Sequence, residues 1–500
     1  MNSQDKRVGA RGNAKGMREY LKKIDDNRIM VEKHDRMNVD GVVYVNEDLR
    51  RIMGTDESIK QVENVASLPG IVKASMAMPD IHWGYGFPIG GVAAFDVGKG
   101  VVSPGGVGYD INCGVRLIRS VLSVQDIKKK IPEIIDRLYT NVPSGVGSHR
   151  KDLRLSRDEL KKVVVKGARW AVENGYGTRE DLDYVEDGGR IEDALPDNIS
   201  DRAFERGKDQ LGTLGSGNHF VEVGYVEDVY DGDAADAFGL SEGQVTIMIH
   251  TGSRGLGYQI CDDYIREMFK ASEKYGIYLA DRQLCCAPVE SPEGQKYLSA
   301  MASAANYAFA NRQMITHWVR ETFEGIFNMS SGKLGLSLIY DVCHNIAKIE
   351  RHKIVEKGES KETTLCVHRK GATRAFPAGN PKIPQRYVSV GQPVLVPGDM
   401  GRASYVLCGT ERAMNETFGS TCHGAGRMMS RSQAIKASKG RSITKELESK
   451  GIYVRAAGKA TFAEEMPEAY KDVSKVVQVV HDAGISKLVA KIIPMGAIKG

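Results

Sequence analysis

The 500-residue sequence predicts an α+β protein that folds as a single large domain. Helical segments and short β-rich runs are interspersed irregularly, without the regular strand–helix alternation of a parallel sheet. No repeat period, low-complexity segment, or Gly/Ser- or Pro-rich linker divides the chain. Hydrophobic residues make up 41% and charged residues 27%, which is the usage of an ordinary globular protein with a sizeable core.

The first 40 residues have the weakest pattern. They are charged and carry only one short amphipathic stretch, at 17–26. We therefore expect residues 1–40 to form a flexible or loosely docked N-terminal arm and residues 41–500 to form the folded domain. The N-terminus lacks the apolar core of a signal peptide, and no run approaches the 18 apolar residues of a membrane span. The eight cysteines show no disulfide framework, so we expect a cytoplasmic protein without a membrane segment.

Capping signals mark three helical segments. The first covers 55–70, from a cap at its first or second residue to a Pro-Gly stop. The second, 156–175, opens with a capping box formed by Ser156 and Glu159. The third, 291–327, has a proline near its start and alanine-rich helical spacing over many turns.

Four β-rich runs separate or follow these helices. They cover residues 245–250, 336–345, 363–371 and 393–410, the last of which has the pattern of a hairpin. The polar stretch 176–202 is the segment we expect to lie on the surface.

His423 stands in a sequence context that is expected to expose its ring. It stands between Cys422 and a Gly-Ala-Gly turn, where two glycines let the backbone bend sharply and uncover the ring. An exposed imidazole beside Arg427 suits phosphate chemistry. A single histidine is more often packed or solvated, so the assignment depends on its grouping with other residues.

A candidate metal site is indicated by five side chains. Asp110 and Cys113 lie three residues apart in a glycine-bounded loop, where a carboxylate and a thiolate can face the same ion. Together with His219, His250 and His344 they form a set in which one thiolate can bridge two imidazole sites. The donors suit Mn²⁺, Fe²⁺ or Zn²⁺, and the sequence does not choose among them. A closed structural zinc site is the alternative, but no C-x-x-C pair supports it, and we favour a catalytic pair of metals.

Glycine-rich stretches supply candidate phosphate contacts. The stretch 212–222 has three glycines in six positions, with Asn218 and Glu222 on either side of His219, and no Walker lysine follows. A plain glycine-rich turn is the alternative. Further polar groups stand in 78–92 and 369–374: Asp80, His82, Arg369, Lys370 and Arg374.

A histidine, two metals and anion-binding loops together suit one mechanism. A neutral imidazole attacks phosphorus while metals neutralise the oxygens and a carboxylate, here Asp80, orients the far ring nitrogen. A two-metal hydrolase would use the same ligands to activate water, but it has no evident need of His423.

These stretches together resemble the RtcB family of RNA-splicing ligases. The motifs are MPDIHWGYGFPIGGV, GYDINCGVR, GTLGSGNHFVE, HTGSRGLG, CHN, RKGATRAFP, SYVL, HGAGR and a terminal KG, in order from residue 78 to the last residue. The resemblance implies an RtcB-like catalytic domain, with mixed β-sheets and surrounding helices around a central metal cleft. It also implies a GTP- and Mn²⁺-dependent ligase that joins an RNA 2′,3′-cyclic phosphate or 3′-phosphate to a 5′-hydroxyl in tRNA splicing and RNA repair.

The resemblance assigns roles to individual residues. Two Mn²⁺ ions are assigned to Asp110, Cys113, His219, His250 and His344, with Cys113 as the bridge. His423 becomes the nucleophile that carries GMP before GMP passes to the RNA 3′-phosphate, and Asp80 orients it. The positions that match nucleotide contacts are Asn218, Glu222, His344, Asn345, Asp399, Ser404, His423, Gly424, Ala425, Gly426, Arg427, Tyr470 and Lys499. Glu222 and Lys499 suit the guanine edge by hydrogen-bond complementarity.

Two positions depart from the family pattern. Asp399 stands where many relatives have serine, and Trp83 follows His82 where many relatives have another residue. The sequence assigns no role to Trp83. Neither position belongs to the predicted metal ligands.

The implied partners are RNA, as tRNA exon halves or broken RNA, and GTP, with an archease-type activator as a candidate protein partner. We expect a monomer rather than an obligate oligomer. Two other functions fit parts of the sequence. A two-metal phosphoesterase would consume the cyclic phosphate without GTP, and a non-enzymatic RNA-binding metalloprotein would rest on the net charge of +5.

Overall fold

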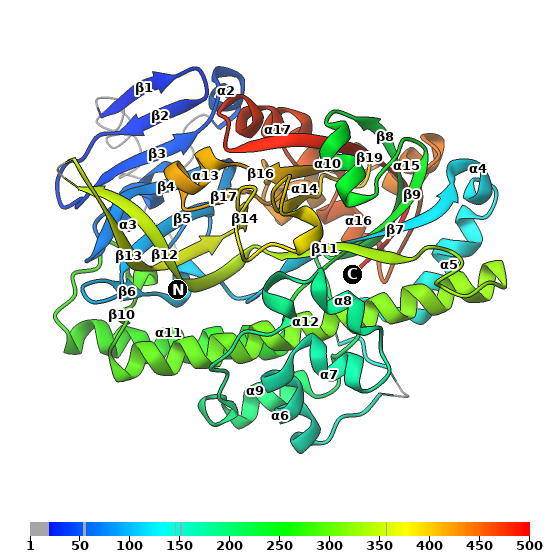
Figure 1. The fold of residues 1–500 in the computed structure, drawn as a ribbon, viewed down its shortest axis with the longest axis horizontal. Helices are drawn as coiled ribbons and strands as arrows, with labels where there is room; N and C mark the ends of the chain where they lie inside the picture. The colour runs from blue at the N-terminus through cyan, green and yellow to red at the C-terminus, as the bar shows by residue number, and fades with distance from the viewer. Residues whose placement is uncertain (1–19, 54–56, 146, 151–152, 357) are drawn as a thin grey trace, which may run out of the picture.

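Two large β-sheets form the centre of the computed structural model, which describes residues 20–500 except 54–56, 146, 151–152 and 357 (Figure 1). The first sheet has seven strands, and its neighbours are antiparallel except for the parallel pair β3–β4. In spatial order its strands are β1 (Leu21–Asp25), β2 (Arg28–Val31), β3 (Asp40–Tyr44), β4 (Ile71–His82), β5 (Ile89–Asp96), β13 (Glu359–Lys370) and β12 (Asn345–Glu356).

The second sheet has eight strands and carries most of the predicted metal ligands at or beside its strand ends. Seven strands follow in the order β11 (Ser337–Cys343), β7 (Gly114–Ser123), β9 (Gln244–Thr251), β8 (Phe220–Val229), β19 (Ser486–Lys499), β16 (Ser404–Gly409) and β15 (Pro393–Val396). The eighth, β18 (Tyr453–Ala456), pairs in parallel with β19. Two small sheets pair β6 (Val101–Val102) with β10 (Ala287–Pro288) and β14 (Ala372–Arg374) with β17 (Ser420–Cys422).

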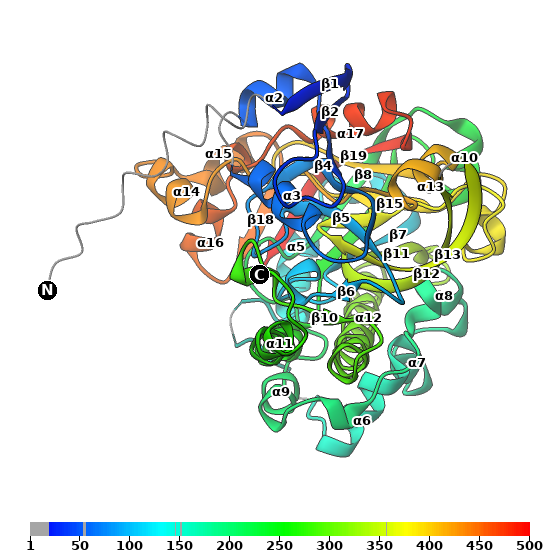
Figure 2. The same cartoon turned by 90° about the vertical axis from the view of Figure 1, so that its left-hand side faces the viewer.

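Helices cover the sheets. Figure 1 shows α11 (Arg254–Lys274) and α12 (Pro292–Phe327) along one side, with α6 (Arg157–Lys166), α7 (Ala168–Glu173) and α9 (Asp201–Gly207) beyond them. Figure 2 shows α14 (Arg431–Ala437), α15 (Ile443–Ser449) and α16 (Lys459–Glu464) gathered at one edge. The other helices are α2 (Glu47–Met53), α3 (Ser58–Ala66), α4 (Val124–Ile127), α5 (Ile131–Asn141), α8 (Arg179–Asp183), α10 (Gly232–Phe238), α13 (Glu411–Thr417) and α17 (Val473–Asp482).

The α+β prediction is confirmed, and most predicted elements are present. The long helix 291–327 is α12, and 393–410 is the antiparallel hairpin of β15 and β16. The capping box of Ser156 and Glu159 also forms. The predicted helix 156–175, however, is two helices, because Gly167 between α6 and α7 has a φ of +59°. The predicted cap at the start of 55–70 lies outside the described residues.

Two polar segments are more integrated than their composition suggests. Within the predicted arm, residues 21–31 form β1 and β2 at the edge of the first sheet; residues 1–19 lie outside the described part. The stretch 176–202, expected on the surface, contains the buried side chains of Asp181 and Glu186. Asp181 accepts two hydrogen bonds of 2.7 Å from Arg320, and Glu186 pairs with Lys348. The expectation for 176–202 is therefore wrong at these residues, whose ionic partners lie more than 130 positions away.

The largest hydrophobic core lies between α12 and its neighbouring helices and the second sheet. Its members include Ile260 of α11, Phe309 of α12 and Ile247 of β9. All eight cysteines are free, in agreement with the absence of a disulfide framework in the sequence, and all are buried. Among the described helices, none combines the length and the apolar character that a membrane crossing requires.

Candidate active site

A cavity of about 1010 Å³ receives side chains from both large sheets and from the segment after β17. Most of the predicted site residues line it: Asp110, Cys113, Asn218, His250, His344, Asn345, Asp399, His423, Gly424, Ala425, Gly426, Arg427, Tyr470 and Lys499. The other four, Asp80, His219, Glu222 and Ser404, stand behind this lining and contact or face it. Residues separated by more than 300 positions thus meet at one site.

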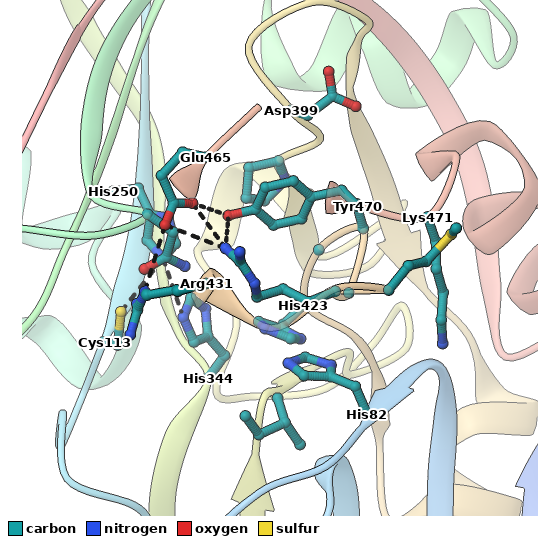
Figure 3. A pocket seen from close by; sticks show the side chains of 18 of the residues that line it. His82, Cys113, His250, His344, Asp399, His423, Arg431, Glu465, Tyr470 and Lys471 are labelled. Carbon is teal, nitrogen blue, oxygen red and sulfur yellow. Dashed lines mark hydrogen bonds and ion pairs between the residues drawn. The ribbon is translucent and has the colours of Figure 1, made fainter. Parts of the chain in front are cut away.

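His423 lies between the imidazoles of His344 and His82, as Figure 3 shows. Its Nδ1–H donates to Asp80 Oδ2 at 2.5 Å, and its backbone N–H donates to the same oxygen at 3.0 Å. Because the proton sits on Nδ1, Nε2 carries a free lone pair. The ring centroids of His423 and His344 are 4.8 Å apart, so this lone pair belongs to the same cavity as the cysteine cluster.

Asp80 is fully buried in β4. Burial alone raises the pKa of a carboxyl group, but the charge and hydrogen bonds of His423 outweigh it, and the pKa of Asp80 is below its usual value. The carboxylate is therefore ionised at neutral pH and holds the Nδ1–H tautomer of His423.

Close backbone packing fixes the loop that carries His423. Gly426 has a φ of +73°, and a Cβ there would lie 2.3 Å from the carbonyl oxygen of Asp80. Lys471 Nζ donates to the carbonyl oxygens of Pro79 and Ile81, at 2.9 and 2.6 Å, on both sides of Asp80. The Lys471 backbone N–H donates to Gly426 at 2.9 Å. These contacts tie the strand of Asp80 to the His423 loop.

The five predicted metal ligands form two adjoining groups that share Cys113. Cys113 Sγ lies 3.3 Å from His250 Nε2 and 3.4 Å from His219 Nε2. On one side His250 Nε2 is 3.3 Å from His344 Nε2, and on the other His219 Nε2 is 2.9 Å from Asp110 Oδ2. Within each group the ligand atoms all lie within 4.8 Å of one another.

This donor set fits divalent cations. Burial lowers the pKa of both His250 and His344, so the two rings are neutral and offer lone pairs. Burial also raises the pKa of the Cys113 thiol, so a cation that binds there would displace the thiol proton. Separations of 3.3–3.4 Å between ligand atoms are those expected around one ion with bonds of about 2.0–2.3 Å. A thiolate shared by two groups is also consistent with two neighbouring ions.

Contacts behind the ligands orient them. The Nδ1–H of His219 donates to the carbonyl oxygen of Leu214 at 3.0 Å, which leaves Nε2 free to bind a metal. Arg312 of α12 donates to the carbonyl oxygens of Asn112 and Thr251, at 2.8 and 3.0 Å, and pairs with Asp341 at 2.8 Å. Asn112 precedes Cys113 and Thr251 follows His250, so one buried guanidinium links the segments of two ligands.

A second group of ionisable residues lies toward the end of β19. Burial raises the pKa of Glu222 to about 7 and that of Asp399 to about 6, and it lowers the pKa of Lys499. Ser404 Oγ donates to Glu222 at 3.5 Å. Glu222 is on β8 and Lys499 is on β19, and the pairing of these strands brings the two residues together. Asp399, at the top of Figure 3, forms an ion pair of 3.1 Å with Arg402.

Three of the predicted nucleotide contacts, Arg427, Tyr470 and Asn345, have protein partners that hold the cavity wall. Arg427 donates to Glu465 at 3.2 Å and to the hydroxyl of Tyr470 at 3.0 Å. Tyr470 also contacts Glu465, as Figure 3 shows. Asn345 donates to the carbonyl oxygen of Asp110 at 3.1 Å and accepts from the Gly371 N–H at 2.8 Å. These side chains therefore hold the walls of the cavity in place.

Two residues at the cavity, Glu465 and Lys471, were not predicted from the sequence. Glu465 is buried and faces the cavity, although its surroundings carry no motif of their own. Lys471 directly follows Tyr470, a position that the resemblance marks, and this adjacency was the only available signal.

An α+β body that brings two adjoining donor groups and an oriented imidazole into one cavity is the arrangement expected of a metal-dependent enzyme. The sequence comparisons agree with this class. The family described as tRNA-splicing ligase RtcB matches residues 61–500, and the chain belongs to this family.

Three archaeal relatives are all described as tRNA-splicing ligase RtcB. The protein of Thermococcus kodakarensis is 56% identical over 481 residues, which cover 96% of this chain and 99% of the relative. That of Archaeoglobus fulgidus is 56% identical over 486 residues, 97% of this chain and 100% of the relative. That of Methanococcus maripaludis is 53% identical over 473 residues, 95% and 97% of the two chains.

Proposed function

We propose that the protein is a GTP- and Mn²⁺-dependent RNA ligase that joins a 3′-phosphate or 2′,3′-cyclic phosphate end to a 5′-hydroxyl end in tRNA splicing and RNA repair. Membership of the ligase family supports the RNA-joining part of the proposal. The observation that carries the chemical part is the position of His423, whose free Nε2 shares a cavity with the Cys113 donor groups.

In the first step His423 Nε2 attacks the α-phosphorus of GTP. An N–P bond forms, the bond to the bridging oxygen breaks, and pyrophosphate leaves with the electron pair. Asp80 stabilises the positive charge that develops on the imidazole, because its carboxylate accepts the Nδ1–H. The side chains of Glu222 and Lys499 suit the guanine edge as acceptor and donor.

In the second step an oxygen of the RNA 3′-phosphate attacks the same phosphorus, and His423 leaves as a neutral imidazole. A cyclic phosphate must first be opened by water to provide that oxygen. In the third step the 5′-hydroxyl attacks the RNA 3′-phosphorus, loses its proton and displaces GMP, which leaves a phosphodiester bond.

Two Mn²⁺ ions would be held by the predicted metal ligands Asp110, Cys113, His219, His250 and His344. When bound, such ions neutralise phosphate oxygens and favour in-line displacement. Around them, Leu214 and Arg312 keep the ligand atoms directed to the cavity.

The test is covalent labelling. Purified protein with Mn²⁺ and GTP labelled at the α-phosphate is expected to acquire an acid-labile, base-stable GMP adduct. His423→Ala should acquire none, whereas Tyr230→Ala, an exposed aromatic outside the cavity lining, should label like the wild type. ATP in excess should not compete.

Absence of label on the wild type, or full label on His423→Ala, would contradict the proposal. A two-metal phosphoesterase would instead consume the cyclic phosphate without GTP and leave the strands unjoined. An archease-type activator, a monomeric state and a cytoplasmic location remain predictions from the sequence.

A further inference from the structure

Trp83 stands out among the three tryptophans of the chain. Its side chain is 50% exposed, whereas Trp170 and Trp318 are only 6% and 4% exposed. It follows β4 directly and lines the cavity beside His82. A single exposed aromatic residue is common on a protein surface, but this ring stands in the lining of the cavity, where it lacks the packing that explains the other two and is free to contact a ligand.

Trp83 is not the only aromatic residue in this part of the cavity. Tyr85 and Tyr109 also line it, and their ring centroids are 5.6 Å apart in an edge-on arrangement. Tyr109 stacks on Tyr258 at 4.8 Å, and Tyr258 is 46% exposed. The three tyrosines form a continuous series of rings that leads from the cavity to the surface.

Cationic groups accompany these rings. The guanidinium of Arg206 lies 4.8 Å from the ring centroid of Tyr258, at the outer end of the series. The cavity lining carries five Lys and Arg residues and three Asp and Glu residues, and Arg431 among them is largely exposed. Aromatic rings interleaved with basic side chains are the surface on which single-stranded nucleic acid binds, because bases stack on the rings while cations contact the phosphates.

We propose that Trp83 stacks a base of single-stranded RNA next to the end that reacts at His423, and that the Tyr85–Tyr109–Tyr258 series continues the aromatic wall of this RNA path toward the surface. This inference rests on the proposed function and adds to it the residues that hold the RNA strand. Trp83 reaches the cavity from the first sheet. The Glu222 and Lys499 side chains that suit the guanine of GTP belong to the second sheet, which leaves the Trp83 ring for another base.

Tryptophan fluorescence tests the proposal directly. A short single-stranded RNA with a 3′-phosphate, and separately one with a 5′-hydroxyl and no 3′-phosphate, is titrated into the protein without GTP. Quenching by either RNA supports the proposal and identifies the strand that contacts Trp83. Trp83→Phe should abolish the quenching yet keep most of the affinity, because phenylalanine also stacks.

Binding measured by fluorescence anisotropy gives the magnitude. Trp83→Ala should weaken RNA binding about 5- to 150-fold, the loss expected for one stacked base. The matched control is Tyr230→Ala, which removes an equally exposed aromatic side chain outside the cavity lining and should bind like the wild type. The wild type should bind RNA with an abasic nucleotide near the reacting end more weakly than it binds intact RNA. Trp83→Ala should bind these two RNAs with nearly the same affinity.

The results separate this inference from the proposed function. GMP labelling of the wild type needs no RNA, so a failure to label contradicts the nucleotidyl-transfer chemistry even where RNA quenches Trp83. The stacking proposal would be overturned if the fluorescence stayed unchanged at saturating RNA. It would also be overturned if the abasic site lowered the RNA affinity of the wild type and of Trp83→Ala equally. Quenching of Trp83 by GTP alone would also overturn it, because the ring would then hold the guanine.

Discussion

Asp80 holds His423 by both its ring and its backbone. One carboxylate oxygen, Oδ2, accepts from Nδ1 at 2.5 Å and from the backbone N–H at 3.0 Å. The orientation of the ring and the position of its proton therefore depend on the same buried group, and the first prediction follows from this relationship.

Asp80→Asn should slow GMP labelling by roughly 10²–10⁴-fold, because the neutral amide no longer stabilises the positive charge that develops on the imidazole when Nε2 attacks. The measurement is the initial rate of labelling, together with GTP affinity, which should change little. The control is Asp48→Asn, an exposed carboxylate that pairs with Lys475. Labelling by Asp80→Asn at the wild-type rate would show that the negative charge of Asp80 is not needed.

Cys113→Ala should lose more bound Mn²⁺ than His250→Ala, because Cys113 belongs to both donor groups and His250 to only one. Metal content is measured after loading and desalting, by elemental analysis. Cys408→Ala, which removes a buried thiol of another part of the fold, should retain the wild-type content. Equal metal content in Cys113→Ala and His250→Ala would contradict a bridging role.

GTP affinity should rise with pH through about 7. Glu222 has its pKa raised to about 7 by burial, so it is protonated below this pH and becomes an acceptor for the guanine N–H groups above it. Calorimetric titration from about pH 5.5 to about pH 8.5 tests this sign. ATP carries the same triphosphate but lacks the guanine edge, so its affinity should not rise with pH. The amide side chain introduced by Glu222→Gln cannot ionise, so the GTP affinity of this variant should not rise either. A rise of the same size in Glu222→Gln would exclude Glu222 as its source.

Arg312→Met should lower the free energy of unfolding by about 3–5 kcal/mol, because it removes one partner of a buried ionic network. Asp341 then keeps its ion pair with Arg116 but loses the one with Arg312. Urea unfolding gives the value. Lys475→Met, which removes an exposed ion pair with Asp48, should change stability by less than about 1 kcal/mol. Similar losses in the two variants would mean that the network contributes no more than a surface pair.

Much of the site could be predicted because its residues occur in local patterns. Glycines around His423 and His219 indicated close backbone approach, and Asp110 and Cys113 stand three residues apart. Helix ends were predicted for the same reason, since the Ser156 capping box involves neighbours along the chain. The roles assigned to these residues remain predictions until they are measured; the structure adds that their side chains meet.

Other features have no local pattern. The polar residues Asp181 and Glu186 resemble a solvated loop until Arg320 and Lys348 are placed beside them. Glu465 and Lys471 acquire their importance only where they contact Arg427 and the carbonyl groups around Asp80.

By itself, the sequence determined the kinds of chemical group available and the local bends and helices, because short-range sterics and hydrogen bonds depend on neighbouring residues. The tertiary structure alone decided that Asp80 and His423, 343 positions apart, share a hydrogen bond. It also decided that Trp83 remains half exposed in the cavity while two other tryptophans are buried. The reason is that burial and long-range pairing are properties of the whole packed chain, whose strand order brings distant segments together.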